Sequence, residues 1–541
     1  MRTLLALSLL LAGCTGSGTL DTDPTPAPDE DPTPPPGCGE TEELTPGRVL
    51  TTSGVVQGTD DGSITSFLGV PFAEAPVGDL RFAEPEPYDC REGVLVADAF
   101  APVCPQADDD GVFDGDEDCL YLNVWTPSGA LSDGAPRPVL FFVHGGGHVA
   151  GSTSNEVSGV SIYDGQALAE AQDVVVVTTA YRLGALGFLA HRALADSDDA
   201  VSGNLGTRDQ QVSLRWVQDN IAGFGGDPER VLLFGESAGA VETCAHLASP
   251  GSAGLFSAAL MESGGCTAKT EEDAFAQGAE RVELLGCTGD DVLGCLRAAS
   301  VEDLVSLNEA PFDDGVFNGN GFGLTVDGDV LPAAPLAVVR AGEHNRVPFA
   351  IGANSDEQSR SVPPGLPTAA QYPTALQSLF GPLAETVEEA YPLSDFDSAH
   401  DAYVAILTDA QFVCPSRRIA RTVRDAQDEP VFRYFFSRAP AGPAGQLYGA
   451  WHGLELLYVF AQLDAMEDAG LYTPEPADHA VSDAMGTAWA NLAADGDPGP
   501  SWPEWDGDEQ ILEFGDVVQA TDDVRVERCD LWDDLATLLG G

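Results

Sequence analysis

Six short apolar runs constrain the fold of this 541-residue chain more than any other feature. Each run is nearly continuous in hydrophobicity, as in parallel strands that are buried on both faces of a sheet. Segments with apolar residues at helical spacing lie between them. This alternation predicts an α/β fold with a large, mostly parallel central sheet and helices on both faces. The runs are 137–147, 173–184, 230–239, 257–265, 347–357 and 429–439.

The first 44 residues differ in composition from the rest of the chain. In residues 1–13 a short basic start precedes an apolar run that is too short to span a bilayer, as in an export signal. The run ends in Leu-Ala-Gly-Cys, which resembles a bacterial lipobox, so we expect lipidation of Cys14. An ordinary signal peptide cleaved at another small residue is the alternative. Residues 14–44, rich in Pro, Asp and Thr, predict an extended tether, and 45–541 a single globular domain.

These N-terminal features also predict a location. We expect an exported lipoprotein of a bacterial cell envelope, at the outer membrane or the cell surface. Its lipid anchor is the only membrane contact that we expect. Thr15, which follows the lipobox where an Asp could stand, favours the outer membrane.

The charge balance is strongly acidic. The chain has 24 Lys and Arg against 87 Asp and Glu, which gives a formal net charge of −63, and Lys269 is its only lysine. Such a surface repels nucleic acid and anionic lipid headgroups, so we expect neither as a partner. The acidity is interpreted as a solubility feature, and attraction of cationic substrates is the alternative.

Eleven cysteines are an odd number for an exported chain. If Cys14 carries the lipid, ten remain, and these predict five disulfides whose pairing the sequence alone does not fix. The sequence contains no Cys-x-x-Cys and no Cys/His cluster with metal spacing. We therefore expect no metal and no cofactor.

The strongest chemical signal is Gly-Glu-Ser-Ala-Gly at 235–239. It fits the G-x-S-x-G pattern, and it lies between a buried strand and a helical segment. The turn between them must be tight, so its flanking positions need glycine, and it lifts the hydroxyl clear of the backbone beside a helix N-terminus. This context indicates that Ser237 is a nucleophile.

A second signal is His-Gly-Gly-Gly at 144–147, which closes an earlier apolar run. An oxyanion hole needs backbone N–H groups that no side chain covers, and glycines provide them. We expect the amides of Gly146, Gly147 and Ala238 to form it. His148 either lines the pocket or packs in the loop.

The residues alone leave more than one candidate for the base and for the acid. In this fold the chain order is Ser, acid, His, which leaves His400, His452 and His479 as candidates. His452 precedes an amphipathic helix, whereas the other two lie in polar helical stretches. Asp356 and Glu357 both follow an apolar run, and either could orient an imidazole.

Several further segments resemble the type-B carboxylesterase family, which includes cholinesterases and bacterial para-nitrobenzyl-type esterases. They occur in family order over about residues 45 to 535, together with the Gly-Glu-Ser-Ala-Gly and His-Gly-Gly-Gly motifs. The resemblance implies an α/β-hydrolase fold and a serine carboxylic ester hydrolase that acts on small-molecule esters through an acyl-enzyme. The segments are FLGVPFAEAPVGDLRF (67–82), EDCLYLNVWTP (117–127), AYRLGALGFL (180–189), GNLGTRDQQVSLRWVQDNIAGFGGDPERV (203–231), GANSDE (352–357) and HGLELLYVF (452–460).

The resemblance also assigns roles to residues that the motifs left open. The family acid falls on Glu357 and the family base on His452. It implies disulfides Cys104–Cys119, Cys287–Cys295 and Cys414–Cys529, and ion pairs Arg81–Glu117 and Arg182–Asp209 in the scaffold. Of the four cysteines that remain, we expect Cys244 to pair with Cys266 and Cys38 with Cys90.

The chain departs from the cholinesterases in the loop 105–118. This loop is strongly acidic and lacks the Trp that grips quaternary ammonium, which puts choline-ester specificity in doubt. It could bind calcium, but it lacks the spacing of an EF-hand, so a solvated loop is expected. The alternatives to an esterase are a non-catalytic adhesion or binding protein on the same fold, and a lipase- or amidase-type hydrolase.

Overall fold

The computed structural model describes residues 38, 44–108, 111–308, 321–506, 510–522 and 524–539. The predicted signal peptide, Cys14 and nearly all of the predicted tether lie outside these residues. None of the helices in the described ranges is both long and apolar enough to cross a bilayer.

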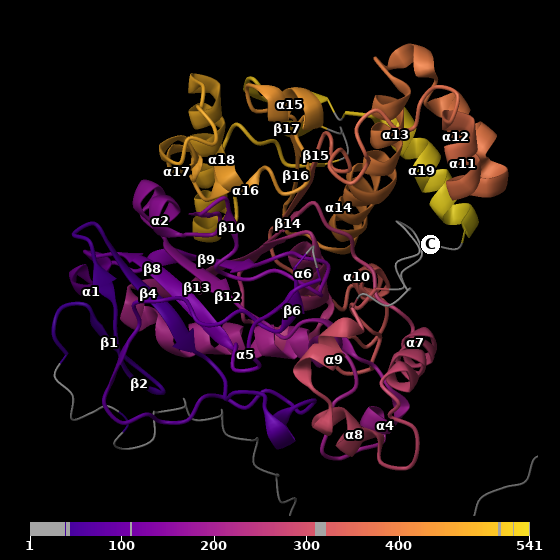
Figure 1. The fold of residues 1–541 in the computed structure, drawn as a ribbon. Helices are drawn as coiled ribbons and strands as arrows, with labels where there is room; N and C mark the ends of the chain where they lie inside the picture. Colours follow the sequence, from indigo (N-terminus) through magenta and orange to yellow (C-terminus); the bar gives the residue numbers. More distant parts are fainter. Residues whose placement is uncertain are drawn as a thin grey trace, which may run out of the picture.

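A large mixed sheet organises the molecule (Figure 1). It has 11 strands in the order β18-β17-β16-β15-β14-β13-β9-β12-β8-β4-β3. The seven strands from β17 to β12 in this order run parallel to one another, whereas β18 at one edge and β8, β4 and β3 at the other pair antiparallel. The predicted parallel sheet is therefore the centre of a mixed one. The strands are β1 (Arg48–Thr51), β2 (Gly54–Gln57), β3 (Thr59–Asp60), β4 (Ile64–Pro71), β5 (Val94–Val96), β6 (Gln106–Ala107), β7 (Phe113–Asp114), β8 (Tyr121–Pro127), β9 (Arg137–Val143), β10 (Glu156–Val157), β11 (Val160–Ser161), β12 (Val175–Thr179), β13 (Gly226–Glu236), β14 (Ala258–Glu262), β15 (Phe349–Asn354), β16 (Val431–Phe436), β17 (Gln510–Phe514) and β18 (Val518–Asp522).

Helices cover both faces of this sheet, because successive residues of each central strand point to opposite sides. In β13, Val231 and Leu233 pack in the core beneath α5, α6, α10 and α14, whereas Leu232 and Phe234 pack in the core beneath α2, α16 and α18. Figure 1 shows α2 and α18 on one side of the strands and α5 on the other. The α-helices are α1 (Ala130–Asp133), α2 (Gln166–Gln172), α3 (Gly184–Phe188), α4 (Arg192–Ala195), α5 (Leu205–Asn220), α6 (Ala238–Ala248), α7 (Glu271–Leu284), α8 (Val292–Ala298), α9 (Val301–Ser306), α10 (Pro335–Ala341), α11 (Tyr372–Phe380), α12 (Ala384–Ala390), α13 (Ala399–Thr408), α14 (Cys414–Ala426), α15 (Pro443–Tyr448), α16 (Leu456–Val459), α17 (Leu463–Asp468), α18 (Pro476–Asp495) and α19 (Val526–Leu539).

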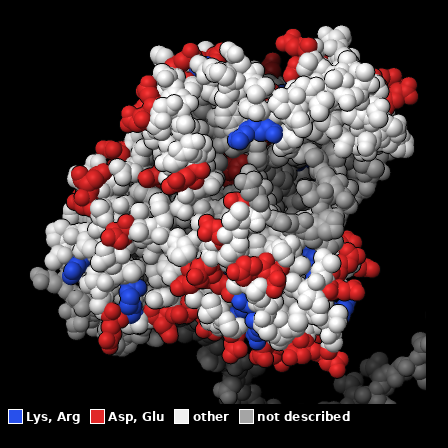
Figure 2. Space-filling view, in the orientation of Figure 1, with Lys and Arg blue, Asp and Glu red and all other residues white. Residues whose placement is uncertain are grey.

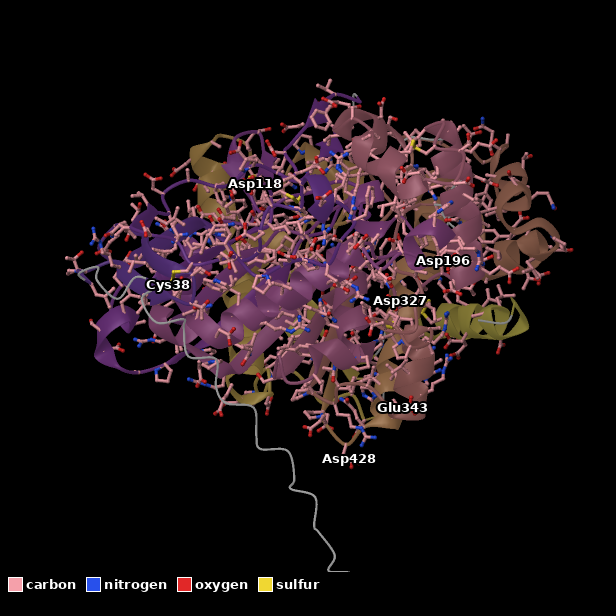
Figure 3. All side chains as sticks on the ribbon, turned by 90° about the horizontal axis from the view of Figure 1, so that it is seen from below. Cys38, Asp118, Asp196, Asp327, Glu343 and Asp428 are labelled. Carbon is pink, nitrogen blue, oxygen red and sulfur yellow. A yellow bond between two sulfur atoms is a disulfide. The ribbon has the colours of Figure 1, made fainter. Side chains whose placement is uncertain are left out.

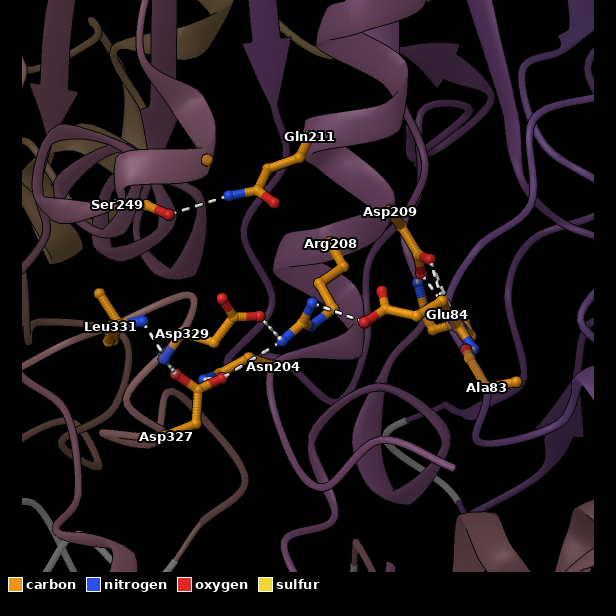
Figure 4. Close-up of polar contacts among 12 residues, drawn as sticks. Ala83, Glu84, Asn204, Arg208, Asp209, Gln211, Ser249, Asp327, Asp329 and Leu331 are labelled. Atoms are coloured by element: carbon orange, nitrogen blue, oxygen red, sulfur yellow. Dashed lines mark hydrogen bonds and ion pairs between the residues drawn. The ribbon is translucent and has the colours of Figure 1, made fainter. Parts of the chain in front are cut away.

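Ion pairs join the N-terminal end of α5 to two distant loops (Figure 4). Arg208 binds Glu84 at 2.6 Å and Asp329 at 2.7 Å. The next residue of the helix, the buried Asp209, pairs with Arg182 at 2.7 Å, as the family resemblance implied. The other implied pair, Arg81 with Glu117, is also present, at 2.7 and 2.5 Å. These pairs fix loops around the sheet and lie outside the site described below.

Five disulfides are present among the described cysteines, and their pairing is the one that the sequence analysis gave. They connect segments that are 8 to 115 residues apart. The longest-range one joins α14 to α19. The pairs are Cys38–Cys90, Cys104–Cys119, Cys244–Cys266, Cys287–Cys295 and Cys414–Cys529.

Candidate active site

Ser237 forms the sharp turn between β13 and α6. Its backbone has φ 56° and ψ −118°, a strained conformation for a residue with a side chain. The flanking glycines make the turn possible, because a Cβ on Gly239 would lie 2.0 Å from the carbonyl oxygen of Val143, and one on Gly235 2.4 Å from that of Gly239. The predicted strand–turn–helix is therefore confirmed in its geometry, and the hydroxyl stands at the carboxyl edge of the sheet.

A cavity of about 450 Å³ opens beside this hydroxyl. Ser237 and Ala238 form part of its wall at the start of α6, and Gly147 and His148 form another part after β9. Phe412 closes it from the π-helical segment Asp409–Val413. The cavity is large enough to hold a small ester beside the serine.

Three backbone amides near Ser237 have no hydrogen-bond partner among the described residues: those of Gly146, Gly147 and Ala238. Gly146 and Gly147 have φ of 112° and 63°, and a Cβ on Gly146 would lie 2.0 Å from the carbonyl oxygen of Ala150. Gly147 and Ala238 line the cavity, whereas Gly146 does not. Free N–H groups beside a nucleophile are what an oxyanion requires.

Glu357 and His452 meet at the same edge of the sheet. Glu357 follows β15 and is 1% exposed. One of its oxygens accepts the backbone N–H of Asn354 at 2.7 Å, and the other lies 2.6 Å from Nδ1 of His452. The Phe412 ring packs on the imidazole, with 5.0 Å between ring centroids. The carboxylate therefore fixes the orientation of the imidazole.

The second imidazole nitrogen faces Glu236, the residue before Ser237. Nε2 of His452 lies 3.1 Å from Oε1 of Glu236. In the described structure no hydrogen bond joins His452 to the Ser237 hydroxyl. His452 therefore approaches Ser237 through the carboxylate of Glu236.

Buried carboxyl groups surround this imidazole. Burial raises the pKa of Glu236, Glu262 and Glu455, each of which is at most 4% exposed. Burial alone lowers the pKa of His452, but the charges of Glu236 and Glu357 outweigh it and raise this pKa above its usual value. The site therefore retains a proton more strongly than an isolated histidine does.

The other candidates from the sequence lie elsewhere. His400 contacts the carbonyl oxygen of Leu366 at 2.7 Å, and the side chain of His479 is 48% exposed. Asp356 accepts the backbone N–H of Ala450 at 3.1 Å and does not contact the imidazole. His148 lines the cavity and also contacts Glu242 at 3.0 Å, so both roles expected for it apply.

No described residue of the acidic loop 105–118 lines the Ser237 cavity, although Gln106 of this loop makes two hydrogen bonds with the backbone of Gly151. Its described part contains the short strands β6 and β7, which pair as a hairpin. No group of three or more His, Cys, Asp or Glu in the described ranges has the geometry to hold a metal ion.

Sequence reasoning missed several residues of the site. Phe412, Lys269 and Phe322 line the cavity, but each comes from a segment whose position depends on the tertiary fold. The buried acids did leave a signal, since Glu236 and Glu262 each follow an apolar stretch at the end of a strand. A carboxylate at the end of a buried strand is rare unless it serves a site.

The strand order, the serine elbow and the carboxylate–histidine pair define an α/β-hydrolase fold. The family model of the carboxylesterase family matches residues 45–532, and the chain belongs to this family. A solved structure described as a thermophilic PNB esterase superposes with a TM-score of 0.78 at 32% identity, over 90% of this chain and 100% of that one. The chain is therefore a carboxylic ester hydrolase.

Named relatives in three organisms support this assignment. The chain is 34% identical to para-nitrobenzyl esterase of Bacillus subtilis (strain 168), over 84% of this chain and 91% of that protein. It is 35% identical to fumonisin B1 esterase of Sphingopyxis macrogoltabida, with 86% of each covered. It is 30% identical to cholinesterase of Mus musculus, over 90% of this chain and 86% of the relative.

Proposed function

We propose that this protein cleaves small-molecule carboxylic esters through an acyl-enzyme on Ser237, with His452 as the base and Glu357 as its orienting carboxylate. His452 removes the hydroxyl proton as Ser237 attacks the ester carbonyl. The oxyanion receives hydrogen bonds from the amides of Gly147 and Ala238, with Gly146 as the third donor. The imidazolium then protonates the departing alcohol, and a water molecule hydrolyses the acyl-enzyme.

The observation that carries this proposal is the 2.6 Å contact between Glu357 and His452, whose imidazole packs against Phe412 in the wall of the Ser237 cavity. A buried carboxylate that already binds Nδ1 leaves Nε2 as the nitrogen for proton transfer. Glu236 directly precedes Ser237 in the chain, so Nε2 of His452 must move from the carboxylate of Glu236 to the hydroxyl of Ser237. Contacts between nucleophile and base are often loose in substrate-free enzymes and tighten when substrate binds.

Replacement of the serine tests this proposal. We expect Ser237→Ala to lose about 10³-fold or more in kcat/KM for short 4-nitrophenyl esters, because the nucleophile is gone. It should also lose covalent labelling by a fluorophosphonate. Ser132→Ala, which alters an exposed serine in α1, should keep both properties. Retained labelling of Ser237→Ala would exclude this serine as the nucleophile, and an absence of labelling in the unaltered protein would favour a binding protein.

We also propose that residues 1–13 are removed on export and that Cys14 carries the lipid that attaches the domain 45–541 to the cell envelope. The lipobox-like Leu-Ala-Gly-Cys and the Pro-rich segment after it support this proposal. In a bacterial host, the full chain should partition into detergent and Cys14→Ala into the aqueous phase. Equal partitioning of both proteins would exclude the anchor.

A further inference from the structure

The only lysine of the chain lies in the wall of the Ser237 cavity. Lys269 comes after β14 and directly before α7, and its backbone is fixed on both sides. Its N–H donates to the carbonyl oxygen of Leu324, and its carbonyl oxygen accepts the N–H of Val326, each at 2.9 Å. The lysine is thus held at a defined place in the cavity wall.

No carboxylate neutralises this lysine in the described part of the chain. Its ammonium group donates one hydrogen bond, to the carbonyl oxygen of Gly321, and makes no ion pair there. An ammonium group has three donors, so two are available to a ligand. A lysine without an acidic partner is unexpected in a chain with 87 Asp and Glu.

A second cation lies behind the same wall. Arg281 of α7 is 3% exposed, and its guanidinium carbon lies 4.3 Å from the centroid of the Phe322 ring, which lines the cavity. Burial and the neighbouring Arg281 lower the pKa of Lys269 to about 8. The guanidinium of Arg281 is thus close enough to act on the ammonium group of Lys269.

We propose that Lys269 makes this cavity selective for esters that carry a carboxylate, such as a monoester of a dicarboxylic acid. The proposal rests on the ester hydrolysis assigned to Ser237 and names its substrate class. The ammonium group binds the free carboxylate while the ester carbonyl lies at Ser237. A carboxylate in a partly dry site gains a charge-assisted hydrogen bond that a neutral analogue cannot form.

Lys269 and the acids near Ser237 act differently on such a substrate. Glu236 lies next to Ser237, and the hydroxyl of Ser263, which lines the cavity, lies 3.5 Å from Glu455. Burial raises the pKa of Glu236 and Glu455 and so favours their neutral forms, whereas the ammonium group of Lys269 attracts a carboxylate. The free carboxylate is therefore directed away from Ser237 and the ester group towards it.

Matched pairs of substrates test the proposal on the full chain. Mono-4-nitrophenyl glutarate and 4-nitrophenyl valerate differ by a carboxylate on the acyl half, and 4-acetoxybenzoate and its methyl ester differ by one on the alcohol half. The measured quantity is the ratio of kcat/KM for the charged ester to that for the neutral ester. We expect one of the two pairs to show a ratio well above unity, and that pair identifies the half that reaches Lys269.

Variants then assign the ratio to the lysine. Lys269→Met, which keeps length but not charge, should lower the ratio by about 10- to 100-fold, and Lys269→Glu should lower it further. Lys269→Arg should restore most of it. Arg340→Met removes an exposed positive charge on α10, outside the cavity wall, and should leave the ratio unchanged. An unchanged ratio in Lys269→Met would overturn the proposal, as would ratios below unity for both pairs in the unaltered protein.

Two controls separate this proposal from the proposed function. Labelling of Lys269→Met by a neutral fluorophosphonate shows that the variant is folded and that its serine is reactive. If labelling persists and the ratio does not change, the substrate class is wrong and the ester hydrolysis stands. If the unaltered protein is not labelled, the proposed function has failed.

A protection experiment tests the proposal without a variant. Glutarate should slow modification of Lys269 by an amine-reactive reagent, and no protection would count against the proposal even if Lys269→Met fails to fold.

Discussion

At the scale of residues, Glu236 links Ser237 to His452, the proposed nucleophile and base. It directly precedes Ser237 in the chain, and its carboxylate lies 3.1 Å from Nε2 of His452. Glu357 holds the other nitrogen at 2.6 Å, so the imidazole lies between two buried acids. Groups that interact this strongly titrate as a unit, and the apparent pKa belongs to the unit.

This arrangement predicts the effect of Glu236→Gln on the pH profile. The negative charge of Glu236 stabilises the imidazolium, so its removal lowers the pKa of His452. An imidazole works as a base only when it is neutral, so activity should persist to lower pH. We expect the acidic limb of kcat/KM for a neutral ester to shift down by about 1 pH unit or more.

Asp356→Asn is the control, because Asp356 follows β15 beside Glu357 but does not contact the imidazole. Its acidic limb should stay in place, whereas Glu357→Gln should lower kcat strongly, since the orienting carboxylate is lost. A limb that moves to higher pH in Glu236→Gln, or a large loss of kcat in Asp356→Asn, would contradict this assignment of the acids.

At the scale of elements, the sequence predicts the central strands well, and the physical reason is their burial. All six apolar runs contain strands, β9, β12, β13, β14, β15 and β16, whose residues are buried on both faces of the sheet. The edge strands were not predicted, since one side of an edge faces solvent or loops and no continuous apolar run marks it. β18, for example, has no buried residue.

Among the elements that form the site, those defined by local sequence could be predicted, whereas those placed by tertiary packing could not. The serine elbow and the glycine run are local turns, so their residues could be predicted from short motifs. The choice of His452 over His400 and His479 depends on where the segment after α15 lies, which required the resemblance to a family. Lys269 and Phe412 entered the site only through the packing of α7 and the π-helical segment, for which the sequence carries no local signal.

At the scale of the whole molecule, the net charge of −63 sets the surface. Figure 2 shows Asp and Glu spread over the visible face, with few basic side chains among them. The view from below in Figure 3 labels further acids in separate regions, Asp118, Asp196, Asp327, Glu343 and Asp428. Like charges over the surface repel one another more in the compact state than in the unfolded chain. Other interactions in the folded state therefore have to offset this electrostatic repulsion.

Salt should screen the repulsion between surface charges, so we expect the thermal stability to rise with salt concentration. Between about 0.01 M and about 1 M NaCl the screening length falls from about 30 Å to about 3 Å, so most surface repulsion disappears. We expect Tm to rise by roughly 3–8 °C, a shift that corresponds to several kcal/mol for a chain of this size. Scans at one fixed rate in both buffers, by near-ultraviolet circular dichroism or calorimetry, measure this shift in Tm.

Two controls test whether charge screening is the cause. An uncharged osmolyte at equal osmolarity is the control for preferential exclusion. Near pH 4.5, where many carboxylates are protonated, the salt effect on Tm should shrink. A Tm that stays constant or falls with salt would show that the folded state has paired its acids well enough to remove the repulsion.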